Sequence, residues 1–223
     1  MAQLLYPRHS TDTHKNATRR HMRLCRQHKG AEKYAIAVEP LLEDLEEKNR
    51  LKEEAKLNKE SAKDNVMLKD TDLDNSIRTL FDKCKAFDRD HPGRPILTQL
   101  FPDGKSSTIV FASYEEEPDM AVHLLTRLAT LGPDHVLASE SQKINDNIDK
   151  CRLALTAHNE AVKILKNTVA NEDISKLNLE KQYEFNYLDA VKEFGKAFAN
   201  RLFPIISSGK KKLLTIVIIR NNN

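Results

Sequence analysis

Three histidines and a cysteine near the N-terminus are spaced so that they share one face of a helix. His14, His21 and His28 recur every seven residues, and Cys25 lies four residues after His21. Imidazole nitrogen and thiolate sulfur are preferred zinc ligands, so His21, Cys25 and His28 form a candidate metal site. The interpretation that we favour is that this face packs against the protein or a partner, because the internal repeat described below puts Leu128 in the position of His21.

Basic side chains surround this candidate site: Lys15, Arg19, Arg20, Arg23 and Arg26. The first 35 residues carry eight Lys and Arg residues against two acidic ones, a net charge of +6 (8 − 2), in a chain whose total is +3. Such a helix can contact the phosphates of nucleic acid or of anionic lipid. However, the basic residues cover several faces, and no aromatic residues alternate with them as a platform for single strands requires. Binding of nucleic acid or of an anionic surface is therefore an alternative to the main prediction.

Other residues with catalytic potential form no complete motif. Gly104-Lys105-Ser106 ends like a phosphate-binding loop, but that motif needs glycine at position 99, where the chain has Gln99. No histidine follows a glutamate at the spacing of a di-metal bundle, and the sequence assigns no serine a histidine and an acid. We therefore expect no enzymatic activity and no bound cofactor.

The composition favours long helices. The 223 residues include six Gly, eight Pro and no Trp, and 31% of them are charged. The three cysteines are far apart and odd in number, which argues against a disulfide framework. The N-terminus lacks the apolar run of a signal peptide, and the most apolar segment, 213–219, is too short to span a bilayer. We therefore expect a cytoplasmic protein without a membrane span.

The chain matches itself at an offset of 107 residues. Thr108-Ile109-Val110 recurs as Thr215-Ile216-Val217, and residues 81–87 align with 188–194 with three identities in seven positions. Further single-residue matches at the same offset extend over most of the half-chain. This pattern predicts a tandem duplication, with a first helical repeat unit at 1–112 and a second at 113–223.

Each repeat is expected to contain three helices and a strand. The expected helices are a short one (12–29 and 119–131), a long one (32–68 and 134–170) and a third (71–90 and 173–202). The two longer helices of a repeat should form an antiparallel hairpin, and β-branched segments at 107–112 and 213–219 should form two short strands. The expected fold class is mainly α: a duplicated helical bundle of two long helical hairpins, each with a short preceding helix, related by a pseudo-twofold axis.

The first repeat is more polar than the second along the expected hairpin seam. Asp44, Lys48 and Asn58 stand where the second repeat is apolar, so this face should need a partner to cover it. Ile216 and Ile218 lie in the second expected strand, which should pair with the first strand or, alternatively, add to another subunit's sheet. The main prediction is a non-enzymatic scaffold or assembly protein that acts through a protein partner or self-association. A nucleic-acid or anionic-surface binder and a metal-binding helical bundle are the alternatives.

Overall fold

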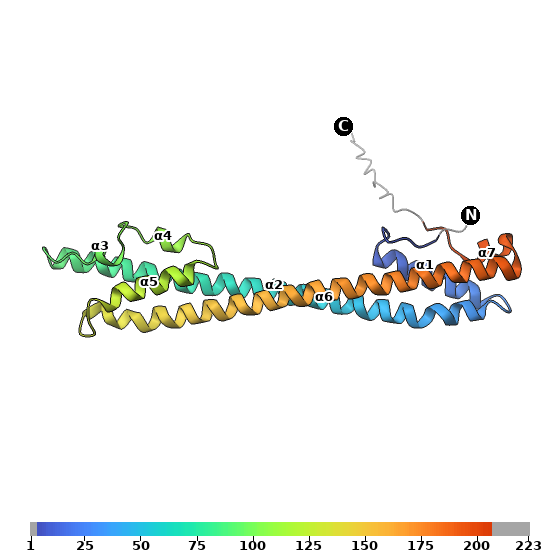
Figure 1. Ribbon diagram of the computed structural model, residues 1–223, viewed down its shortest axis with the longest axis horizontal. Helices are drawn as coiled ribbons and strands as arrows, with labels where there is room; N and C mark the ends of the chain where they lie inside the picture. The colour runs from blue at the N-terminus through green and yellow to red at the C-terminus, as the bar shows by residue number, and fades with distance from the viewer. Residues whose placement is uncertain (1–3, 207–223) are drawn as a thin grey trace, which may run out of the picture. The chain divides into compact units, whose positions relative to one another are not determined.

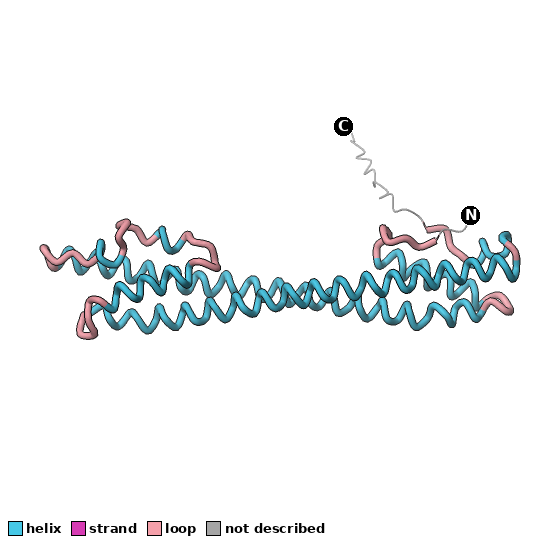
Figure 2. Tube along the Cα trace, in the orientation of Figure 1, coloured by secondary structure: helices cyan, strands magenta, loops and turns pink. Residues whose placement is uncertain are grey.

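The protein is mainly helical (Figure 1). The computed structural model describes residues 4–206. Its elements in chain order are α1 (Thr11–Arg26), α2 (Glu32–Asp90), α3 (Leu97–Leu100), α4 (Ser107–Val110), α5 (Glu117–Ala129), the 3-10 helix η1 (Val136–Ser139), α6 (Glu140–Phe194) and α7 (Lys196–Leu202). Residues 4–206 contain helices and loops and no strand (Figure 2).

The chain divides into two compact units. Unit 1 comprises Met1–Arg50 and Ala170–Asn223, and unit 2 comprises Leu51–Val169. The long helices α2 and α6 each contribute to both units, whereas α1 and α7 belong to unit 1, and α3, α4, α5 and η1 belong to unit 2. These units do not coincide with the sequence halves 1–112 and 113–223, because each unit combines residues of both halves.

In unit 1, the start of α2 runs antiparallel to the end of α6. Tyr34 of α2 bonds to Glu193 of α6, and Asp44, ten residues later in α2, bonds to Ser175, earlier in α6. α1 and α7 pack against each other (Figure 1). The buried apolar side chains that close this core come from several segments and include Leu5, Met22, Tyr34, Val38, Leu42, Leu45, Leu179, Tyr183, Leu202, Phe203 and Ile206.

In unit 2, the end of α2 runs antiparallel to the start of α6. Lys83 forms an ion pair with Glu140, and Asn147 Nδ2 donates to the Asp72 carbonyl oxygen at 3.1 Å. α5 packs against α3, α4 and η1. The buried apolar residues of this core include Leu73, Ile77, Leu80, Leu100, Phe101, Ile109, Leu124, Leu128, Ile144 and Ile148.

The expected helical hairpins are wrong, because each pair of helices is one continuous helix. α2 continues through residues 69–70, and α6 continues through the turn expected at 171–173. Asn-Glu-Asp has no residue that breaks a helix, since Asn and Asp lower helix stability by only about 0.7 kcal/mol each. α6 ends instead before Gly195, whose φ of +80° suits glycine, and α2 ends before the Pro92-Gly93 pair.

The first expected strand is also wrong. Segment 107–112 contains the short helix α4, and its β-branched residues Ile109 and Val110 are buried against α5. Packing of apolar side chains has therefore decided the local structure over β propensity. The second expected strand, 213–219, lies outside the described residues, as do Ile216 and Ile218.

Over residues 4–206, no helix is both long enough and apolar enough to cross a membrane.

The three cysteines, Cys25, Cys84 and Cys151, are buried and unpaired. Burial raises the pKa of each thiol to about 12. All three are therefore protonated and unreactive in the folded protein.

Candidate functional site: an exposed apolar stripe on α6

The end of α6 has two faces of opposite character. The buried face follows a spacing of three and four residues along the helix: Glu172, Ser175, Leu179, Tyr183, Asn186 and Ala190. This spacing keeps the side chains on one side of the helix, where they meet α2 and α1. The face therefore belongs to the core of unit 1.

Three hydrogen bonds fix the rotation of α6 against α2. Ser175 Oγ donates to Asp44 Oδ2 at 2.5 Å, and Asn186 Nδ2 donates to the Tyr34 carbonyl oxygen at 2.8 Å. Tyr34 Oη donates to Glu193 Oε2 at 2.9 Å. Because buried polar groups that lose their partner are destabilising by about 1–3 kcal/mol each, a rotated α6 is disfavoured and the opposite face is held outward.

Charges support the same arrangement. His14 Nε2 lies 2.7 Å from Glu180 Oε1 between α1 and α6, and both side chains are buried. Burial, with the adjoining Glu193 carboxylate, raises the pKa of Tyr34. A hydrogen bond from Lys33, joined by one from Tyr34, lowers the pKa of Glu193. The Tyr34 hydroxyl is therefore a permanent donor and Glu193 a permanent acceptor across neutral pH.

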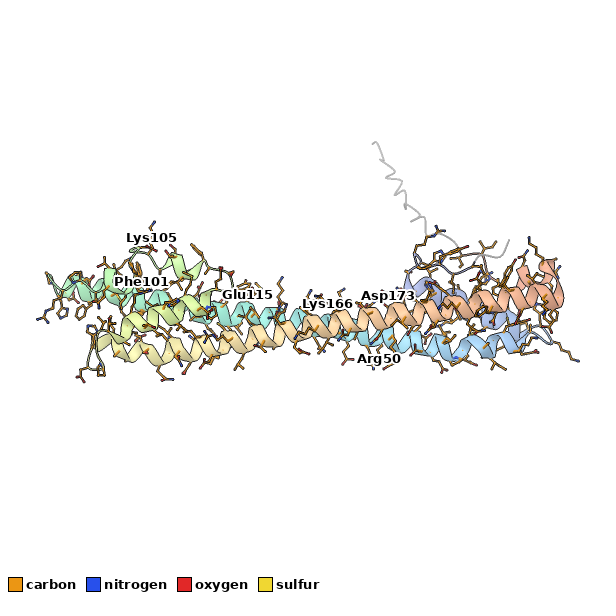
Figure 3. The ribbon with its side chains drawn as sticks, viewed as in Figure 1. Arg50, Phe101, Lys105, Glu115, Lys166 and Asp173 are labelled. Atoms are coloured by element: carbon orange, nitrogen blue, oxygen red, sulfur yellow. The ribbon has the colours of Figure 1, made fainter. Side chains whose placement is uncertain are left out.

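Within unit 1, the outward face of α6 carries four large apolar side chains. Their exposed fractions are 57% for Ile174, 44% for Leu177, 59% for Phe185 and 54% for Leu188. We name this set the α6 stripe; it begins one residue after Asp173, which is labelled in Figure 3. At 100° per residue the four positions fall within about 80° of one another, on the side opposite the buried face. The stripe is about 21 Å long at 1.5 Å per residue.

An exposed stripe of this kind is a feature of binding surfaces. Soluble monomers rarely leave several neighbouring large apolar side chains in water, because their burial is favourable by about 25 cal/mol per Å². The stripe offers four apolar contacts and no group that would act as a nucleophile. The stripe is therefore a candidate surface for contact with another apolar surface.

The predicted metal residues lie in α1 and the turn after it. His21 is buried, and its Nδ1 donates to the Leu202 carbonyl oxygen at 2.8 Å, with Cys25 Sγ 3.5 Å from the same nitrogen. The His28 ring instead contacts the Phe198 ring, with 5.2 Å between the two ring centroids. Within residues 4–206, no three His, Cys, Asp or Glu side chains form a group that could hold a metal ion. Burial also lowers the pKa of His21 to about 4, as suits a neutral core side chain.

The basic residues of α1 are largely compensated by acids. Three of the five form ion pairs: Lys15–Asp12 at 2.8 Å, Arg19–Glu46 at 2.8 Å and Arg26–Glu39 at 2.5 Å. Arg20 and Arg23 are exposed. A surface whose cations are already paired offers fewer contacts to a phosphate backbone, which weakens the nucleic-acid alternative.

The predicted interaction residues are not brought together. Asp44 is half-exposed; it accepts the Ser175 hydrogen bond and lies 3.6 Å from Lys48 Nζ, so it links α2 to α6 within unit 1. Asn58 is exposed and belongs to unit 2. We therefore take the α6 stripe, rather than these residues, as the candidate interaction surface.

A buried acid cluster in unit 2 is the other unusual feature. Glu117, in the first turn of α5, is 1% exposed and faces Asp70 and Asp74 of α2. Glu117 Oε1 and Asp74 Oδ1 are buried without a hydrogen-bond partner among the described residues, and Arg78 reaches the other Asp74 oxygen at 3.4 Å. Burial, with the two aspartates, raises the pKa of Glu117 to about 10. This carboxyl group is therefore protonated at neutral pH.

Sequence reasoning missed both features. The stripe residues recur at intervals of three, eight and three, a helical signal, but α6 is apolar on two faces and the sequence does not say which turns inward. Asp70 and Asp74 are one turn apart, which puts them on one face. Their meeting with Glu117 depends on tertiary packing and has no local signal.

The comparisons with known proteins found no match: no family model, no curated protein and no solved structure resembles this chain.

Proposed function

We propose that the chain is a non-enzymatic assembly protein that binds a protein surface through the α6 stripe. The observation that carries this proposal is the exposure of Ile174, Leu177, Phe185 and Leu188 on the face of α6 opposite its buried face. Large aromatic and aliphatic side chains on a rigid helix are typical anchors of helix-mediated binding. Because polar contacts hold the inner face of α6, the stripe is presented without rearrangement of unit 1.

Photocrosslinking tests this function. A photoreactive phenylalanine analogue replaces Phe185 in the full-length protein, in cells that make it naturally. We expect discrete protein adducts at this position, and their loss when Leu188→Glu is added. Ile36 supplies the matched control, because it is 66% exposed, apolar and also in unit 1, but on α2. Absence of adducts at position 185, or equal adducts at position 36, would contradict the proposal.

We also infer that the two halves arose by tandem duplication. α1 and α5 begin at residues 11 and 117, and α2 and α6 begin at residues 32 and 140, close to the sequence offset of 107. α1 and α5 also each border a groove that is lined in part by a proline. In unit 1 the groove, of about 210 Å³, is lined by Thr13, Asn16, Arg20 and Pro204 among others.

The groove of unit 2 uses corresponding positions. It has a volume of about 300 Å³, and its lining includes Met120, His123, Arg127 and Pro102. The three helix positions are each 107 residues after those of unit 1 (13, 16 and 20), which supports the duplication. An experimental structure in which α1 and the start of α2 do not superpose on α5 and the start of α6 would contradict it.

A reducing compartment fits the cysteines. All three are buried as free thiols, and proteins of oxidising compartments more often use such residues in disulfides. This supports the proposed cytoplasmic location, which fractionation of cells with an antibody to the protein tests.

A further inference from the structure

The α6 stripe is symmetric about Lys181. Ile174 and Leu188 lie seven residues before and after it, and Leu177 and Phe185 lie four residues before and after it. Lys181 itself is exposed. A helix face with this symmetry is complementary to an antiparallel copy of itself, since every residue at distance n before the centre meets one at distance n after it.

Resting on the proposed function, we propose that the partner of the α6 stripe is a second copy of this chain, bound antiparallel about a twofold axis at Lys181. Ile174 of each chain then packs on Leu188 of the other, and Leu177 packs on Phe185. This register places the large Phe185 ring against the smaller Leu177 side chain, and Ile174 against Leu188, a side chain of equal size. A parallel pair would instead place the two Phe185 rings at the same level and the two Ile174 side chains at another.

The charges beside the stripe favour the antiparallel register. Glu184 is exposed and lies three residues from Lys181, on the edge of the stripe. A twofold axis perpendicular to the helices puts Glu184 of both chains on the same edge, less than one turn from both Lys181 side chains. The two ammonium groups at the centre are thus neutralised by two carboxylates, and the long lysine stems cover apolar surface. In a parallel pair the two glutamates lie on opposite edges.

Disulfide trapping tests the partner and the register together. A disulfide forms only where Cα atoms approach to about 4.4–6.8 Å, and the three native cysteines are buried. Lys181→Cys in the purified full-length chain should give a disulfide-linked dimer under mild oxidation. Ile174→Cys alone should not, because its two copies would lie about 21 Å apart, or 14 residues at 1.5 Å each. A mixture of Ile174→Cys and Leu188→Cys chains should give the mixed dimer.

The control is Ile36→Cys, an exposed apolar position in unit 1 outside the stripe. Helix content by circular dichroism checks that each variant folds. Self-linkage of Ile174→Cys would overturn the antiparallel register in favour of a parallel one. If folded Lys181→Cys forms no disulfide-linked dimer, the partner of the stripe is not a second copy of this chain. The same result is expected if residues 207–223 cover the stripe, so that outcome also overturns the proposal. If position 185 still forms adducts with another protein in cells, the proposed function would survive that failure.

Discussion

Replacing Glu117 by glutamine is expected to stabilise unit 2 at neutral pH. Glu117 is 1% exposed and faces two aspartates, so folding holds a proton on it that the unfolded chain releases above its ordinary pKa of 4.5. Glutamine is neutral in both states. Its side-chain amide has two N–H donors for the carboxylates of Asp70 and Asp74, whereas the protonated acid has a single O–H donor.

The size of the effect follows from proton linkage. The pKa of Glu117 is raised by folding to about 10, so its contribution to stability is fully present below pH 4.5 and is lost as pH rises toward 10. Within that window the loss is about 1.4 kcal/mol per pH unit. At pH 7, two and a half units above 4.5, the ionisation of the unfolded state costs about 3 kcal/mol, which Glu117→Gln should recover.

Hydrogen exchange followed by mass spectrometry on peptides of α5 measures this locally. The wild type should lose protection between pH 6 and pH 9, after correction for intrinsic exchange rates, whereas Glu117→Gln should stay nearly constant. Glu115→Gln is the matched control, because Glu115 is exposed in the loop before α5 (Figure 3). If Glu117→Gln keeps the wild-type pH dependence, or is less stable than wild type at pH 8, Glu117 does not hold a proton in the folded protein.

Three further predictions concern unit 1. The stability of unit 1 should fall by about 3 kcal/mol in total as pH drops from 6.5 toward 4. Buried His21, with a pKa of about 4, takes up a proton less readily than the unfolded chain does. Hydrogen exchange of α1 peptides that does not change over this pH range would contradict the prediction. Gly195→Ala should lower the melting temperature, with a stability loss of about 1 kcal/mol, because Gly195 has a φ of +80° that strains an alanine. Lys196→Ala is the control. An unchanged melting temperature in Gly195→Ala would contradict the prediction. Labelled oligonucleotides at low salt should show no binding to the protein in fluorescence anisotropy, because Arg19 and Arg26 already pair with acidic side chains. Salt-sensitive binding that Arg20→Glu abolishes would instead favour the nucleic-acid alternative.

The helical class and several helix limits were predictable from the sequence, because they depend on local chemistry. α1 begins after Ser10, whose side chain accepts from the Thr13 amide as an N-cap. The end of α6 before Gly195, at a positive φ, has an equally local cause, but the helix expected at 173–202 ran past it and was wrong there. The error at 171–173 has the same origin: a polar tripeptide resembles a turn, but it weakens a helix too little to end one that packing supports on both sides.

The candidate surface was not predictable, because it depends on which face of a helix turns inward. Around Tyr183 and Phe185, apolar residues occupy both sides of α6, and the side-chain contacts of Asn186 and Ser175 decide between them. The same limit applies to Glu117, whose sequence position suggests an ordinary acid in a first helical turn. Only its burial against α2 makes it unusual.

Hydroxyl-radical labelling of Phe185 as a function of protein concentration tests the α6 stripe as an interface most directly. We expect the reactivity of Phe185 to fall as concentration rises and copies associate, while the reactivity of exposed Ile36 stays constant. Equal labelling of Phe185 at low and high concentration, with a mass that stays at the 25.5 kDa of one chain, would contradict it.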